Sequence, residues 1–125
     1  MTYYLSYSPL FPSIGGYTEK YKLYVYGYNS SSTAGDSFLA SHVNHHGAAF
    51  STNDRDNDDS SDNCAVTSHG AWWYRGSPDC HSSNLNGRWA DRSGAGPQWW
   101  GPGGRAKLSA SFTEMKVRLN SMNIV

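Results

Sequence analysis

Residues 50–65 read FSTNDRDNDDSSDNCA, and this acidic stretch is the most informative part of the chain. Carboxylates at this density repel one another unless a cation gathers them. Alternating spacing lets one turn of chain direct several oxygens at one point, which suits Ca²⁺. The alternative is a solvated acidic turn. Five of the chain's eight aspartates lie within nine residues: Asp54, Asp56, Asp58, Asp59 and Asp62.

The acidic stretch does not have the pattern of an EF-hand. That loop requires glycine at position 6 and glutamate at position 12. Counted from Asp54, these positions hold Asp59 and Ala65, and a count from Asp56 fails in the same way. A calcium loop here would therefore be of another kind.

Composition bounds the class of protein. The 125 residues suit one domain, and ten basic side chains balance ten acidic ones, which argues against an electrostatically driven nucleic-acid binder. No apolar run approaches the roughly 20 residues that span a bilayer, so no membrane insertion is expected. The chain has few aliphatic residues, but its eighteen aromatic residues can bury enough apolar surface to form a core. The composition therefore predicts an aromatic core.

Three segments alternate apolar and polar residues as strands do. They are 21–28, 107–112 and 113–119. The segment 71–74, Ala-Trp-Trp-Tyr, is expected to be a short strand or a buried corner. The remainder of 51–106 is predicted to form long loops, because serine, glycine and asparagine favour turns over helix interiors.

Read together, several motifs resemble the C-terminal part of a fibrinogen-like domain. The matching stretches are 50–58, 63–65, 70–74, 80–87 and 112–118, and residues 21–23 and 33–37 fit the same pattern upstream. The resemblance implies a loop-rich α+β fold with a small antiparallel sheet, long calcium-binding loops and few short helices. Residues 1–20 match poorly, and residues 21–125 would form a partial domain that lacks the family's N-terminal subdomain.

The resemblance also implies which atoms would hold Ca²⁺. Side-chain carboxylates would come from Asp56 and Asp58, and backbone carbonyl oxygens from Ser60 and Asp62. A surface loop of this type is expected to bind calcium with a dissociation constant of about 10⁻⁴–10⁻³ M.

The two cysteines, taken alone, are compatible with a disulfide or with two reduced thiols. The resemblance pairs Cys64 with Cys80 and thereby implies a secreted, extracellular protein. Residues 1–16 have no basic region and contain Pro9 and Pro12, so no signal peptide is expected within this chain.

In the family, a ligand pocket lies beside the calcium loop. The resemblance places Asp79, Cys80 and His81 in that pocket, often with a cis peptide bond before the cysteine, although His81 could instead be structural. Ser68 stands where many acetyl-binding members carry an aromatic residue, and Ser93 or a gap replaces a pocket tyrosine. Trp89, Trp99 and Trp100 are candidate replacement walls, and Trp99 is assigned to the ligand site.

The implied function is calcium-dependent, lectin-like recognition of acetylated sugars or related acetylated surface groups, in innate immunity. The alternative is a protein–protein interaction module, such as a receptor or adhesion ligand, on the same scaffold. A homo-oligomer is compatible with both. Catalysis is not expected: Asp79, His81 and Ser82 have triad residue types, but near-adjacent residues aim poorly at one atom, and no G-x-S-x-G elbow is present.

Overall fold

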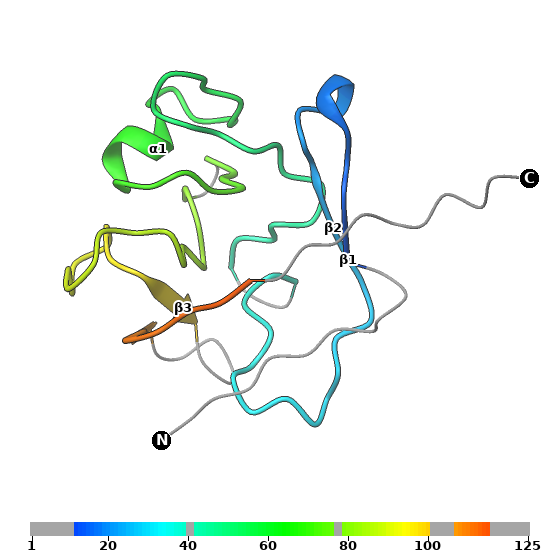
Figure 1. The fold of residues 1–125 in the computed structure, drawn as a ribbon, viewed down its shortest axis with the longest axis vertical. Coiled ribbons are helices and arrows are strands. Elements are labelled where there is room, and N and C mark those ends of the chain that lie inside the picture. The colour runs from blue at the N-terminus through cyan, green and yellow to red at the C-terminus, as the bar shows by residue number, and fades with distance from the viewer. Residues whose placement is uncertain (1–11, 40–41, 77–78, 101–106, 116–125) are drawn as a thin grey trace, which may run out of the picture.

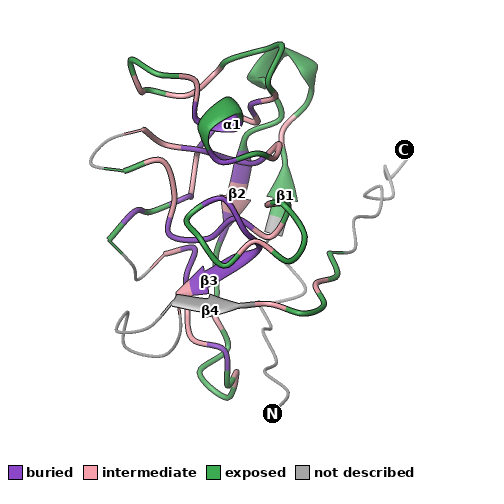
Figure 2. Cartoon of the chain, turned by 90° about the vertical axis from the view of Figure 1, so that its left-hand side faces the viewer, coloured by how far each residue is buried: buried purple, intermediate pink, exposed green. Residues whose placement is uncertain are grey.

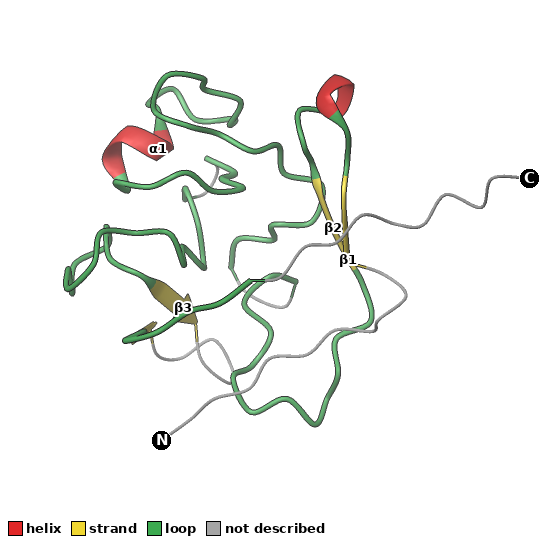
Figure 3. Ribbon diagram, in the orientation of Figure 1, coloured by secondary structure: helices red, strands yellow, loops and turns green. Residues whose placement is uncertain are grey.

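Regular secondary structure is sparse in the computed structural model, which describes residues 12–39, 42–76, 79–100 and 107–115. Within the described residues, loops connect two small antiparallel sheets, one short α-helix and one 3₁₀ helix (Figure 3). This arrangement confirms the predicted loop-rich fold. The elements are β1 (Pro12–Ile14), a 3₁₀ helix (Tyr17–Glu19), β2 (Leu23–Val25), α1 (Cys64–Thr67), β3 (Gln98–Trp100) and β4 (Lys107–Ser109).

The first sheet pairs β1 with β2, and Ile14 lies opposite Leu23. Leu23 and Val25 are buried, so the alternation predicted for 21–28 is real but the strand is shorter. Tyr21 has a φ of 53° and belongs to the turn before β2. Gly27, with a φ of 65°, redirects the chain after it. Left-handed residues end extended pairing on both sides.

The second sheet pairs β3 with β4, with Trp99 opposite Leu108. The strand predicted over 107–112 is therefore present but ends at Ser109. Residues 113–115 are described and are not a strand, which corrects that part of the 113–119 prediction; residues 116–119 lie outside the described residues. The Thr113 hydroxyl instead donates to the carbonyl oxygen of Leu85, 3.4 Å away. β1 and β3 were not predicted.

The core is rich in aromatic residues, as the composition predicts. Figure 2 shows which parts of the chain are buried. Trp72 is fully buried and stacks on Phe38, with ring centroids 6.0 Å apart. Its backbone exchanges two hydrogen bonds with Ser51, so 71–74 is a buried segment with one isolated bridge. The Trp73 and Trp99 indoles donate to distant carbonyls, those of Tyr21 and Ala34. These two indoles thus keep hydrogen-bond partners, whereas the buried Trp72 Nε1 has none among the described residues.

Within the part of the chain that the structure describes, no helix has the length and apolar character needed to cross a bilayer.

Candidate functional site

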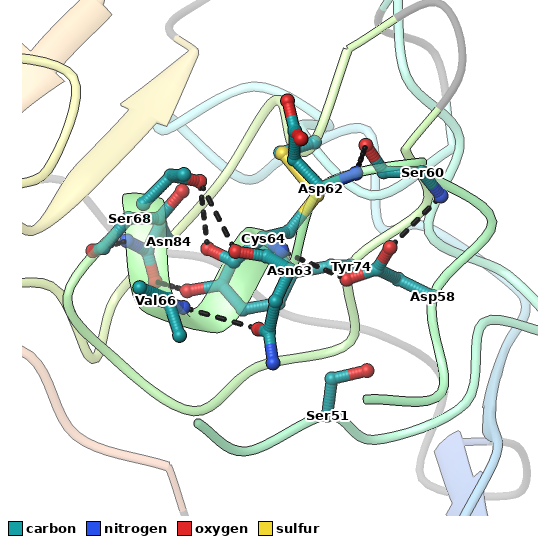
Figure 4. The surroundings of a disulfide bond; sticks show 12 residues. Ser51, Asp58, Ser60, Asp62, Asn63, Cys64, Val66, Ser68, Tyr74 and Asn84 are labelled. Carbon is teal, nitrogen blue, oxygen red and sulfur yellow. Dashed lines mark hydrogen bonds between the residues drawn. A yellow bond between two sulfur atoms is a disulfide. The ribbon is translucent and has the colours of Figure 1, made fainter. Parts of the chain in front are cut away.

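The acidic loop winds through a repeating hydrogen-bond pattern. Asp56 Oδ1 accepts from the Asp58 N–H at 3.1 Å, Asp58 Oδ1 from Ser60 at 2.8 Å, and Ser60 Oγ from Asp62 at 3.1 Å. Each side-chain oxygen thus fixes the backbone two residues ahead. The result is a tightly wound turn whose even-numbered residues are the predicted calcium ligands. Figure 4 shows three of them, Asp58, Ser60 and Asp62.

Asp58 lies at the centre of this turn. Its Oδ2 accepts a second hydrogen bond, from the Cys64 N–H at 3.0 Å. Partial burial raises the pKa of Asp58, and the neighbouring Asp56 carboxyl raises it further. Two backbone N–H bonds act in the opposite direction but do not outweigh these causes. A bound cation would favour the ionised form of the Asp58 carboxyl against these causes.

The donor set fits Ca²⁺ only if backbone oxygens complete it. Among the described residues, no three His, Cys, Asp or Glu side chains converge on one point. The carboxylate of Asp62 points away from Asp58 in Figure 4, so it is not counted in the donor set. The Asp54 carboxylate has another partner, the Thr52 hydroxyl, which donates to it at 2.6 Å and lowers the pKa of Asp54. Two carboxylates plus carbonyl oxygens remain, which is a hard-oxygen set of the kind that calcium takes.

The disulfide joins Cys64 to Cys80, with Cα atoms 5.6 Å apart, and confirms the implied pairing. Cys64 is also the first residue of α1. That helix begins here because Asn63 caps it, its Oδ1 accepting from the Val66 N–H at 3.1 Å. The acidic loop, α1 and the disulfide therefore share one junction.

Removing the disulfide should lower the free energy of unfolding by about 3 kcal/mol, because the bond closes a short loop in the unfolded chain. The test is urea denaturation of the oxidised wild type and of a Cys64→Ala/Cys80→Ala double variant. An unchanged midpoint and slope would show that the bond does not restrict the unfolded ensemble.

The predicted ligand residues lie next to the disulfide. Asp79 Oδ2 is 3.1 Å from His42 Nε2, and both side chains are more than half exposed. The His81 ring is 5.8 Å from the ring of Tyr74. Ser82 is buried, and its hydroxyl accepts from the Val43 N–H at 2.9 Å. Asp79 and Ser82 thus have separate partners on the 42–43 segment.

Ser68 and Trp99 lie deeper than a pocket rim. Ser68 is buried as the C-cap of α1, and its carbonyl accepts from the Asn84 side chain at 3.1 Å. Trp99 is 6% exposed and packs edge-on against Phe38, with ring centroids 5.0 Å apart. Little of the indole surface is left for a ligand.

His45 is the residue that the sequence analysis missed. It is fully buried, and its Nδ1 lies 2.8 Å from the Trp73 carbonyl oxygen. Its Nε2 accepts from the N–H groups of both Ser82 and Ser83, each at 3.1 Å. A carbonyl only accepts and an amide N–H only donates, so the ring is neutral with its proton on Nδ1. Burial lowers the pKa of His45 to about 4.

The segment around His45 also holds the loop before Cys80. The Arg75 guanidinium donates to the carbonyl oxygens of Asn44, at 2.8 Å, and of His46. The Arg75 carbonyl accepts from the Asp59 N–H at 2.7 Å. One arginine thus connects 44–46 to the acidic loop. No sequence signal marked these contacts, because they depend on tertiary proximity.

Comparisons with known proteins agree with this architecture. The family model described as "Fibrinogen beta and gamma chains, C-terminal globular domain" matches residues 4–120. Tenascin-R from Rattus norvegicus is 46% identical over 99 residues, which cover 78% of this chain and 7% of that protein. Fibrinogen C domain-containing protein 1 from Homo sapiens is 46% identical over 91 residues, which cover 70% of this chain and 18% of that protein.

Solved structures show the same fold. The fibrinogen-like globe domain of human ANGPTL6 aligns with a TM-score of 0.58 and 37% identity, covering 71% of this chain and 38% of that one. Lamprey fibrin D-dimer, complexed with the peptide Gly-His-Arg-Pro-amide, aligns with a TM-score of 0.62 and 22% identity. The alignment covers 95% of this chain and 46% of that one. The chain belongs to the fibrinogen C-terminal domain family, and it spans 7% and 18% of the length of the two curated relatives above.

Proposed function

We propose that this chain is an extracellular, calcium-dependent recognition module for small acetylated ligands. Calcium would be held by the carboxylates of Asp56 and Asp58 and the backbone carbonyls of Ser60 and Asp62. The ligand would contact the neighbouring residues Asp79, Cys80 and His81. A bound cation would supply positive charge that favours the ionised Asp58 carboxylate and would order the loop.

One observation carries the proposal. Asp58 accepts from the backbone of Ser60 with one oxygen and from Cys64 with the other. Cys64 is bonded through sulfur to Cys80, the middle one of the three predicted ligand residues 79–81. A cation bound to the Asp58 carboxylate would therefore be connected to the ligand segment through two contacts. These are the Asp58–Cys64 hydrogen bond and the Cys64–Cys80 disulfide.

The acetyl group suits this segment because it has an apolar methyl and one hydrogen-bond acceptor. The ring pair of His81 and Tyr74 offers apolar surface, and a backbone N–H near Cys80 would donate to the acetyl oxygen. His81 is then a binding residue. His45 is a positioning residue, because it holds the backbone N–H of Ser82, the residue directly after His81.

A second function, protein binding, is supported by a specific feature of the same site. Ser68 stands where the resemblance places a pocket aromatic, and both Ser68 and Trp99 are buried. These two features reduce the aromatic walls available to a small acetylated ligand. A protein ligand would need a wider surface and fewer enclosing walls.

The test is retention of the oxidised protein on immobilised N-acetylglucosamine in millimolar calcium, after circular dichroism has confirmed folding. Retention with elution by EDTA and by free acetate is expected. His81→Ala should lose retention while its circular dichroism is unchanged. If the folded protein flows through, acetyl binding is refuted and the protein-binding function takes its place.

Calcium binding is tested separately by stability. At calcium about tenfold above its dissociation constant, the free energy of unfolding should rise by about 1.4 kcal/mol. Asp56→Asn should abolish the gain, because an asparagine oxygen can still accept from the Asp58 N–H but carries no charge. Asp54→Asn is the matched control, because Asp54 is bonded to Thr52. Equal calcium responses in both variants would remove Asp56 from the site.

A further inference from the structure

We propose that Asn29 carries an N-linked glycan. Residues Asn29, Ser30 and Ser31 form an Asn-X-Ser acceptor sequence with a central residue other than proline. None of the other eight asparagines of the chain has serine or threonine two positions later. This proposal rests on an extracellular route and not on the identity of the ligand.

The acceptor sequence is presented in an accessible form. Asn29, Ser30 and Ser31 are all exposed and lie in a turn between β2 and the core residue Ala34. The Ser31 N–H donates to Asn29 Oδ1 at 2.9 Å, and the Ser32 N–H donates to the Asn29 carbonyl at 2.9 Å. Both bonds use oxygen atoms of Asn29. Within the described residues, no hydrogen bond uses its Nδ2, the atom that a glycan would occupy.

The turn is held in place from both ends by hydrogen bonds of its flanking residues. The Tyr28 hydroxyl donates to the Ser32 carbonyl at 3.2 Å. The Trp99 indole donates to the Ala34 carbonyl at 3.1 Å. These contacts anchor the flanks to the core and leave the three acceptor residues facing solvent.

The position of the turn is compatible with ligand binding. Between β2 and Ala34 the chain forms the lower loop in Figure 1, at the opposite end of the molecule from α1 and the acidic loop. Figure 2, turned by 90°, shows the same separation. A glycan on Asn29 would therefore leave the acidic loop and the disulfide accessible to a ligand.

The compartment required for the modification is the one that forms disulfides in secreted proteins. Both cysteines of this chain are joined in the structure. A chain oxidised on the secretory route meets the glycosyl donor, an oligosaccharide on a lipid pyrophosphate. Asn29 Nδ2 would lose one proton to a base of the transferase and bond to the anomeric carbon. The C–O bond to the pyrophosphate would break, and the lipid pyrophosphate would leave with that electron pair.

The experiment expresses the full chain behind a cleavable secretion leader in mammalian cells. Total cell protein and medium are both analysed by intact mass, with and without peptide N-glycosidase F. The expected result is one glycan per chain, removed by the enzyme with conversion of Asn29 to aspartate, a gain of about 1 Da over the unmodified residue.

Matched variants locate the modification. Asn29→Gln and Ser31→Ala should lose the glycan, whereas Ser30→Ala and Ser31→Thr keep the acceptor sequence and should retain it. Cell-retained protein is included, so poor secretion of a variant does not obscure its glycosylation state. An unmodified wild-type chain in both fractions, or a glycan that persists in Ser31→Ala, would overturn the proposal. Neither outcome bears on calcium or acetyl binding, which are measured on unglycosylated protein.

Discussion

Replacing His45 with alanine should lower the free energy of unfolding by at least about 4 kcal/mol. The substitution removes the acceptor of two buried N–H groups, of Ser82 and Ser83, and the donor to the Trp73 carbonyl. Each buried polar group left without a partner costs about 1–3 kcal/mol. Urea denaturation at pH 7.5 measures the loss. His42→Ala is the control, because that side chain is more than half exposed.

The same ring should make the wild type sensitive to acid. Its pKa is about 4 in the folded protein and about 6.5 when unfolded, so the unfolded state binds more protons between these values. The stabilisation is complete above pH 6.5 and is lost as the pH falls towards 4. Between pH 7.5 and pH 5 the loss should be about 2 kcal/mol. Stability that is flat over this range would contradict a neutral, buried His45.

Replacing Trp72 with alanine should cost about 3–5 kcal/mol, because the side chain is fully buried and a cavity would remain. Its ring contacts both Phe38 and Trp73, at centroid distances of 6.0 and 5.2 Å. The protein should lose near-ultraviolet circular dichroism at a lower urea concentration than the wild type.

Trp89→Ala is the matched control for this substitution. Trp89 is 69% exposed, so its replacement should change stability by less than about 0.5 kcal/mol. Equal losses at the two positions would place Trp72 outside the core and contradict the packing described above.

The sequence predicted the parts of the fold that depend on local pattern and motif. The alternation around Leu23 and Val25 indicated β2, and the motifs around Cys64 and Cys80 implied the disulfide that the structure contains. The aspartate spacing indicated a tightly wound loop, and the observed bonds from Asp56 to Asp58 and from Asp58 to Ser60 have that two-residue period.

The features that the sequence did not predict depend on distant partners. β3 lacks alternation because Gln98 and Trp99 are both buried, so no periodicity marks it. Tyr21 has strong strand propensity, but the turn requires it in a left-handed conformation. His45 is flanked in the sequence by two other polar residues, Asn44 and His46, and nothing in the sequence distinguishes it from them. Its structural role comes from two hydrogen bonds to distant residues, from Nδ1 to the Trp73 carbonyl oxygen and from the Ser82 N–H to Nε2.

The indole hydrogen bonds have a consequence for how the chain folds. Trp73 bonds to a carbonyl 52 residues away and Trp99 to one 65 residues away. Such contacts require long loops to close before any stabilisation is gained, and the short hairpins offer little local compensation. Chains dominated by distant pairings fold in about milliseconds to seconds. Partly folded molecules would expose tryptophan surface during that interval, so folding yield should depend on protein concentration.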